Sequence, residues 1–414
     1  MRPVLLVVPL LFVLACVSCF ISQRYMTTVS ATLKSLRSVS AESAPVTVIP
    51  SERSMRSSTA GTSTRPPPPR RPRAILHVGP HKTGSTSFQK FCYGNKPVLL
   101  QDNFLLPQLD AVFKREKTVA NLGFCLQTQN LDPPCDQIVG NATRFLEQAR
   151  QQNKSVLIST EEFSKASVDL DRLEALVAGF DVEVVVVYRR FYEYLPSIYF
   201  ETFKHSQTTY QEKGTEGLLK RPTFAEWLTP EIGPRFRRQH TSDVLERYQR
   251  LGPVQVYNWY APGDFLSNFV CSLNLTNACR EAQNIQPAAS NAGYSFDSEI
   301  ILAEAHRRHL VDWGELVQQN NYTIILGQLN EFLTEHRKHG NGAEYICLSE
   351  TQERDLLRLS IEIEEAILPS IGSSNLEDID EDFRKQDGAF CSLNVTDFFN
   401  RHKAPLGDLL RSIA

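Results

Sequence analysis

Short apolar runs alternate along the chain with longer segments in which apolar residues recur every three or four positions. Four runs have the length and β-branched content of buried parallel strands; these are residues 74–78, 155–159, 182–188 and 254–259. Helical periodicity marks the segments between and after them, at residues 85–91, 141–152, 169–180, 224–228, 243–251 and 263–273. Strands that alternate with helices join as right-handed β-α-β units, so the pattern predicts an α/β fold with a central parallel sheet covered on both faces.

Two other parts of the chain have a different pattern. Residues 96–134 show no sustained period, which predicts a surface insertion with one helix around 109–117. The C-terminal third is helical, with periodic segments at 298–319, 323–336 and 349–368. We expect these helices to pack on the sheet and to shape one side of a binding site there.

The N-terminal part has neither of these patterns. Residues 4–22 are uncharged and apolar over a length that can cross a bilayer as a helix. Residues 23–73 are rich in Ser, Thr, Pro and Arg and carry too little apolar surface to fold. The sequence therefore predicts a cytoplasmic tail at 1–3, an uncleaved transmembrane signal-anchor, a disordered stem, and a folded domain over 74–414. A cleaved signal peptide is the alternative, because the apolar run contains small residues suited to a cleavage site.

The net charge, the cysteines and the glycosylation sequons bear on the partners and the cellular compartment of the protein. The formal net charge is only −3, so we expect no nucleic-acid partner. Cysteine spacings fit no zinc pattern, so we expect disulfides and no metal, with Cys125–Cys135 and Cys271–Cys279 as local pairs. Seven cysteines follow the apolar segment, and this odd number leaves at least one outside an intrachain disulfide. Five glycosylation sequons that suit a lumenal domain lie at Asn141, Asn153, Asn274, Asn321 and Asn394.

The segment 74–91, AILHVGPHKTGSTSFQKF, places a glycine-containing loop between a strand and the start of a helix. Such a loop binds anions, because Gly79 and Gly84 let backbone N–H groups approach and the helix N-terminus carries partial positive charge. Lys82 lies inside the loop, where its ammonium can contact phosphate or sulfate oxygens. A glycine turn that binds nothing is the alternative for so short a motif. Further hydroxyl donors come from Ser85, Thr86 and Ser87.

A second motif follows the strand at 182–188. Arg189 comes directly after this strand, and Ser197 lies eight residues further on, in a predicted helix. A guanidinium forks onto phosphate oxygens and a hydroxyl adds a donor, so the pair can hold a second anionic group. Pro196 predicts a delayed helix start, which would shift Ser197. Because both motifs follow predicted strands, at the edge where parallel sheets bind ligands, we expect one common site.

Together the two motifs resemble those of sulfotransferases that use 3′-phosphoadenosine-5′-phosphosulfate (PAPS). Nucleoside-triphosphate P-loops have lysine directly after the second glycine, whereas here lysine precedes Gly84 by two residues, as in the 5′-phosphosulfate loop of that family. The resemblance runs from about 74 to 273 and includes TFAEWL at 223–228 and VQVYNWY at 254–260. It implies a P-loop-type three-layer fold. It also implies a PAPS site made of Lys82, Thr83, Gly84, Ser85 and Thr86 at the 5′-phosphosulfate and of Arg189 and Ser197 at the 3′-phosphate.

The resemblance further implies a reaction. Family members move the sulfuryl group of PAPS to a hydroxyl or amine without a metal, and Lys82 would stabilise charge on the departing group. The acceptor must lose a proton, and Glu161, at the end of the strand 155–159, stands where relatives carry a base. Glu161 or its neighbour Glu162 could instead cap the following turn, and His81 in the loop is the second candidate for the base. With the anchor and the sequons, this predicts a single-pass type II Golgi membrane protein that acts on a lumenal glycan or glycoprotein.

Two other function classes stay open. A P-loop kinase or NTPase is disfavoured by the missing Gly-Lys-Ser/Thr sequence and the expected lumenal location. A non-catalytic lumenal glycoprotein with this fold is also compatible, since His81 replaces the usual proline and Pro196 precedes the serine. The sequence does not specify the acceptor or the oligomeric state.

Overall fold

The computed structural model describes residues 71–107, 119–127, 134–203, 219, 221–285, 296–312, 322–339, 345–371, 376–386 and 390–413. They all belong to one compact unit, Pro68–Ala414. The predicted tail, the membrane segment, nearly all of the stem and the helix around 109–117 lie outside the described residues and stay predictions. None of the helices described is both long and apolar enough to cross a membrane.

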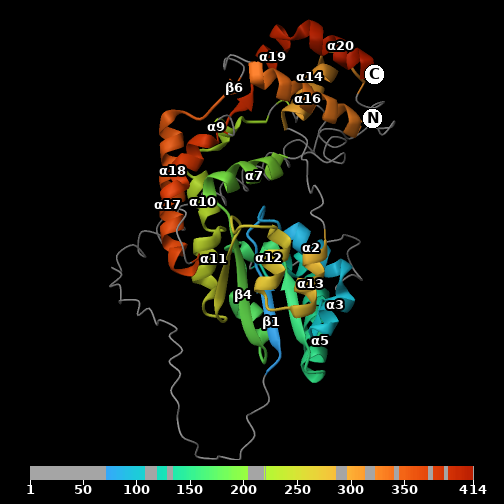
Figure 1. Ribbon diagram of the computed structural model, residues 1–414, viewed down its shortest axis with the longest axis vertical. Coiled ribbons are helices and arrows are strands. Elements are labelled where there is room, and N and C mark those ends of the chain that lie inside the picture. The colour runs from blue at the N-terminus through green and yellow to red at the C-terminus, as the bar shows by residue number, and fades with distance from the viewer. Residues whose placement is uncertain are drawn as a thin grey trace, which may run out of the picture. The chain divides into compact units, whose positions relative to one another are not determined.

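A five-stranded parallel sheet forms the centre of the fold (Figure 1). Its spatial order is β2-β3-β1-β4-β5. Four strands match the predicted apolar runs to within one residue at each end. The strands are β1 (Arg73–His77), β2 (Phe104–Leu105), β3 (Ser155–Ser159), β4 (Asp181–Tyr188) and β5 (Val254–Asn258).

Side chains alternate between two apolar layers, one on each face of the sheet. On β1, Leu76 packs with the first layer and Ile75 with the second. Burial of one such side chain contributes about 1.5–3 kcal/mol, and both are fully buried. The first layer is completed by α4 (Ala120–Cys125), α5 (Pro134–Gln151), α6 (Leu170–Val177) and α11 (Thr241–Tyr248). The second is completed by α2 (Ser85–Gly94), α3 (Lys96–Gln101), α12 (Phe265–Ser272) and α13 (Thr276–Asn284). The predicted α/β fold is therefore confirmed.

Two predictions at the margins of the sheet are wrong. The segment 96–134 is not merely a surface insertion, because it supplies the edge strand β2 and buried residues such as Leu99 and Leu122. A two-residue strand is too short to leave a period in the sequence. The predicted stem ends too late, since Arg73 already belongs to β1, where its backbone N–H donates to Ser155 Oγ at 3.0 Å.

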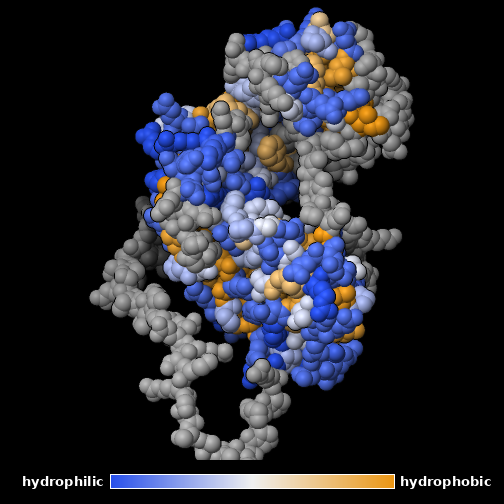
Figure 2. Space-filling view, in the orientation of Figure 1, coloured by the Kyte–Doolittle hydropathy of each residue, from blue (hydrophilic) through white to orange (hydrophobic). Residues whose placement is uncertain are grey.

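Helices beyond the sheet form two further apolar groups. The first contains α7 (Phe191–Phe203), α9 (Phe224–Trp227), α10 (Ile232–Arg237), α17 (Glu350–Ile371) and α18 (Leu376–Lys385). Within it, α17 contacts α7, α11 and β5, so the expected packing of C-terminal helices on the sheet is confirmed for this helix. Figure 2 shows hydrophilic residues on the outer side of α17 and α18, where α18 carries ion pairs such as Arg384–Asp380.

The second group has its own apolar core. It contains α14 (Phe296–Arg307), α16 (Tyr322–His339), α19 (Val395–Arg401) and α20 (Lys403–Ile413). The strands β6 (Tyr345–Ile346) and β7 (Ser392–Leu393) pair antiparallel beside it. The predicted helix at 298–319 begins two residues earlier than expected, and α14 ends at Arg307, while the predicted residues 313–319 lie outside the described part of the chain.

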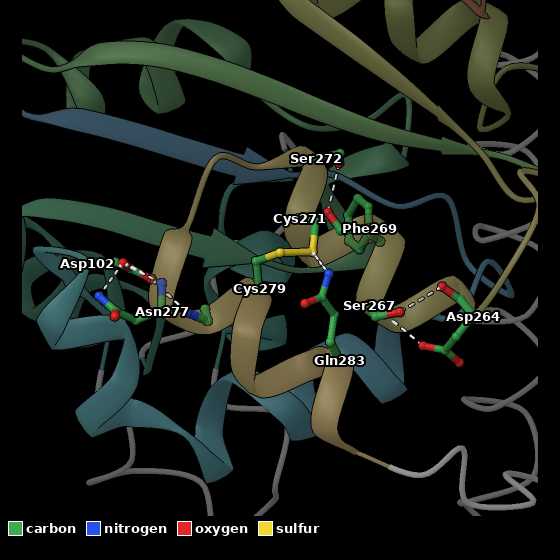
Figure 3. Close-up of a disulfide and its surroundings, with 10 residues drawn as sticks. Asp102, Asp264, Ser267, Phe269, Cys271, Ser272, Asn277, Cys279 and Gln283 are labelled. Atoms are coloured by element: carbon green, nitrogen blue, oxygen red, sulfur yellow. Dashed lines mark hydrogen bonds between the residues drawn. A yellow bond between two sulfur atoms is a disulfide. The ribbon is translucent and has the colours of Figure 1, made fainter.

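The described cysteines form three disulfides. Two are the predicted local pairs, Cys125–Cys135 and Cys271–Cys279, and the third is Cys347–Cys391. Cys92 is buried and is the only described cysteine outside a disulfide. Figure 3 shows Cys271–Cys279 joining α12 to α13, whose first turn is capped by the Asp102 carboxylate.

Candidate functional site

The loop between β1 and α2 has the backbone of an anion-binding turn. Gly79 and Gly84 both have positive φ, 92° and 78°. At Gly84 a side chain is also excluded by space, because a Cβ would lie 2.5 Å from Trp259 and 2.7 Å from Phe265. Gly84 is the N-cap residue of α2, which has no side-chain cap and no acidic residue in its first turn. The first N–H groups of the helix are therefore available to an external acceptor.

Lys82 lies in this loop in a left-handed conformation, with φ 63°. Its Nζ is 2.6 Å from Glu201 Oε2 on α7, and the two side chains are 34% and 50% exposed. Its carbonyl oxygen accepts a hydrogen bond from Arg189 Nη1 at 3.0 Å. The loop lysine is thus joined at its backbone and at its side chain to the region of the second motif.

Arg189 follows β4 and connects the two motifs. The same Nη1 that donates to the Lys82 carbonyl also donates to Ser197 Oγ at 3.1 Å. Its Nε donates to Glu193 Oε2 at 3.2 Å, one helical turn further along the chain. The guanidinium carbon lies 5.9 Å from the centre of the Trp259 ring. The arginine and serine that the sequence pairs are in contact, and they lie directly beside the loop.

Ser197 lies inside α7, and the predicted delay of that helix is wrong. The helix begins at Phe191 and continues through Pro196. Proline removes one backbone hydrogen bond from the helix, but residues around it such as Tyr194 and Leu195 are fully buried and hold the segment in place. Ser197 Oγ donates to the Glu193 carbonyl at 3.0 Å, as helical spacing allows.

The hydroxyl residues of the loop have different environments. Thr83 is fully buried, and its Oγ1 donates to the Pro80 carbonyl at 2.6 Å, so this hydroxyl braces the loop. Ser85 is 4% exposed, whereas Thr86 is exposed. Of the three predicted hydroxyl donors, Thr86 is therefore the exposed one, Ser87 is half-buried and Ser85 is buried.

Glu161 follows β3 and packs against the loop. It is 5% exposed, and its Oε2 accepts a hydrogen bond from Gln89 Nε2 at 2.9 Å. A Cβ on Gly79 would lie only 3.1 Å from Glu161 Cα, which shows how closely the loop passes. The turn after β3 is capped by Thr160, whose Oγ1 accepts from the Glu162 N–H at 3.2 Å. The capping role considered for the two glutamates therefore belongs to Thr160.

Glu162 and His81 form a separate charged group beside the loop. Glu162 lies 3.5 Å from His81 Nε2 and 2.6 Å from Lys165 Nζ. Burial alone would raise the pKa of Glu162, but hydrogen bonds from His81 and Lys165 outweigh it and lower the pKa to about 2. Glu162 is therefore an ionised partner for His81 at neutral pH.

Sequence reasoning missed four neighbours of these residues. Gln89 contacts Glu161, Glu193 and Glu201 contact the two cations, and Trp259 lies beside Gly84. Glu193 stands four residues after Arg189, a spacing that becomes a signal only once the helix is seen to begin before Pro196. The other three come from segments whose approach is decided by the tertiary fold.

Comparisons with known proteins add little to this geometry. No family model matches the sequence, and no curated protein matches it. Among solved structures, the chain is similar to one from a study of the PezAT chromosomal toxin-antitoxin system of Streptococcus pneumoniae, with 14% identity and a TM-score of 0.26. The match covers 58% of this chain and 88% of that one. A likeness this weak carries no argument about function.

Proposed function

We propose that this protein is a PAPS-dependent sulfotransferase of the Golgi lumen, anchored as a type II membrane protein, that acts on a glycan or glycoprotein hydroxyl or amine. One observation carries the proposal: Arg189 touches both the Lys82 carbonyl and the Ser197 hydroxyl. Two motifs that lie more than one hundred residues apart thereby line a single edge of the sheet. Because one guanidinium lies beside both motifs, a single ligand with two anionic groups is the simplest occupant of this edge.

The residues divide the binding of the nucleotide between them. The Lys82 ammonium, the first N–H groups of α2 and Thr86 face the 5′-phosphosulfate. Arg189 and Ser197 hold the 3′-phosphate, with Glu193 fixing the guanidinium from its other side. Thr83 acts through the backbone, because its hydroxyl is used within the loop. No residue in this scheme needs a metal.

The transfer is an in-line displacement at sulfur. A lone pair on the acceptor oxygen or nitrogen forms the new bond to sulfur as the bond between sulfur and the bridging phosphate oxygen breaks. Glu161 takes the acceptor proton, and the electron pair of the broken bond stays on the phosphate of 3′-phosphoadenosine 5′-phosphate (PAP). Lys82 stabilises the negative charge that grows there.

His81 is the second candidate for the base. Its imidazole is oriented by the ionised Glu162, an arrangement found in many acid–base pairs. Replacing each candidate by glutamine separates the two. We expect Glu161→Gln to abolish transfer and His81→Gln to reduce it less; the opposite order would assign the base to His81.

Nucleotide binding tests the proposal before any acceptor is known. Calorimetric titration with PAP should show binding to the full-length protein, and Lys82→Ala and Arg189→Ala should each abolish or strongly weaken it. Lys90→Ala and Arg250→Ala are matched controls, because they remove the same charges from exposed positions outside the site. Normal PAP binding by both site variants would refute this site.

The same titrations distinguish the other function classes. Tight binding of ATP with magnesium in place of PAP would indicate a P-loop kinase or NTPase. PAP binding without transfer from radiolabelled PAPS to any of a panel of glycans and tyrosine peptides would favour a non-catalytic protein. A positive acceptor in that panel defines the substrate class.

A further inference from the structure

Gln89 lies in α2 beneath the loop and has no role in the scheme above. It is 8% exposed. Its Nε2 donates to Glu161 Oε2 at 2.9 Å and to the Ser159 carbonyl at 3.3 Å, with Ser159 Oγ also at 3.3 Å. A carboxylate and a carbonyl are both pure acceptors, so the amide must present its NH₂ group, not its oxygen, to this corner. Each hydrogen of that group then has its own acceptor.

Ser159 extends the contact to a second buried group. Its Oγ lies 2.7 Å from His77 Nδ1, and His77 is fully buried in contact with the rings of Phe88 and Phe269. Burial lowers the pKa of His77 to about 4, although the nearby Glu161 raises it in part. The imidazole is therefore neutral at pH 7 and adds no charge to the site. Its hydrogen bond fixes the hydroxyl that stands under the amide of Gln89.

These bonds tie three elements together at one point. His77 ends β1, Ser159 ends β3, and Gln89 belongs to the helix that follows the loop. Glu161 lies two residues beyond the end of β3, and its carboxylate accepts a hydrogen bond from Gln89. A carboxylate on a short 3₁₀ turn has rotatable bonds that must be fixed if its oxygen is to meet an acceptor proton. The amide supplies that restraint from a rigid helix.

We propose that Gln89 is the positioning residue of the base Glu161, held in turn by Ser159 and His77. The inference rests on the proposed function, since it gives Glu161 a base role. Gln89 touches neither nucleotide nor acceptor in this account. Hydrogen bonds that orient the ligands of metal sites are worth about 10- to 100-fold in activity; we expect a loss of the same order here, in kcat and not in KM or in PAP affinity.

Three variants test the role. Gln89→Leu keeps the volume and removes the donor, so transfer to the acceptor found in the panel should fall by that factor at every pH. Gln89→Glu is isosteric and can donate only when protonated, so activity should recover as the pH falls and the two carboxyls share a proton. Lys90→Ala, one residue further along α2 and exposed, is the matched control and should behave as the wild type.

A spectroscopic readout tests the contact without an acceptor. In protein labelled with [¹⁵N]glutamine, the Gln89 side-chain signals are identified by their loss in Gln89→Leu. They should move in Glu161→Gln, because a hydrogen bond to a charged acceptor is stronger than one to an amide. Unmoved signals would overturn the inference.

The outcomes separate this inference from the proposed function. If the wild type does not bind PAP, the proposed function fails, whatever the signals of Gln89 show. If the wild type binds PAP and transfers sulfate while Gln89→Leu has an unchanged kcat and Gln89→Glu has an unchanged pH profile, only the positioning role fails. A loss of PAP affinity in Gln89→Leu would also count against it, because it would place the residue in nucleotide binding.

Discussion

The ion pair between Lys82 and Glu201 predicts that removing the Glu201 carboxylate strengthens nucleotide binding. Both side chains are substantially exposed, and such a pair contributes at most about 1 kcal/mol. A phosphate that binds the Lys82 ammonium displaces the Glu201 carboxylate, so the carboxylate competes with the ligand. In Glu201→Gln the competitor is gone, and PAP should bind up to about fivefold more tightly, which is 1 kcal/mol converted at 1.4 kcal/mol per factor of ten.

A double-mutant cycle shows whether the gain comes from this pair. PAP is titrated by calorimetry, at one fixed ionic strength, into the wild type, Glu201→Gln, Lys82→Ala and the double variant. The gain should appear only where the lysine is present. Glu174→Gln is the matched control, since it removes an exposed carboxylate that pairs with Arg250. An equal gain in the control or in the Lys82→Ala background would refute the competition and leave a general effect of charge.

Three further predictions concern stability and the loop. Gly84→Ala should lower the free energy of unfolding by about 1–2 kcal/mol because of the left-handed backbone alone, and it should also weaken PAP binding because its methyl group meets Trp259. Urea unfolding and calorimetry measure the two effects, and a stable variant with normal affinity would contradict the loop geometry. Replacing Cys347 and Cys391 by serine opens a bridge across 44 residues, and should lower the free energy of unfolding by about 4 kcal/mol; an unchanged melting temperature would contradict this. His77 stays neutral in the folded state down to a pKa of about 4 but takes a proton near pH 6.5 when unfolded. The free energy of unfolding should therefore fall by about 3 kcal/mol as the pH drops from about 6.5 to about 4. His77→Gln should flatten that dependence, and an unchanged slope would show that other groups cause it.

The sheet was predictable because its strands are encoded locally. The run 182–188 is β-branched and nearly continuous, as a strand buried on both faces requires, and β4 covers Asp181–Tyr188. By contrast, β2 is only two residues long and owes its pairing to β3. No local pattern distinguishes such an edge strand from a surface loop, so the insertion at 96–134 was misjudged.

The proximity of the candidate site residues was predictable where one motif carries several of them. The loop and the Arg189–Ser197 pair have fixed spacings, and the fold brings them together. The acidic partners could not be read in the same way, because Glu201 on a helix looks like any solvated acid until the fold places it beside Lys82. The helix start predicted from Pro196 was wrong for a related reason. Burial of the aromatic face of α7 stabilises the helix by more than the one backbone hydrogen bond that proline removes.

The central claim is that the two motifs hold opposite ends of one adenosine bisphosphate. It is tested most directly by comparing PAP with adenosine 5′-phosphate, which lacks the 3′-phosphate, in calorimetric titrations of the wild type and two variants. The wild type should prefer PAP, and Arg189→Ala should remove that preference, since charged hydrogen bonds of about 1.5–3 kcal/mol are lost for PAP alone. Lys82→Ala should weaken both ligands alike. If Arg189→Ala weakened both ligands equally, or neither, the arginine would not hold the 3′-phosphate and the account would be contradicted.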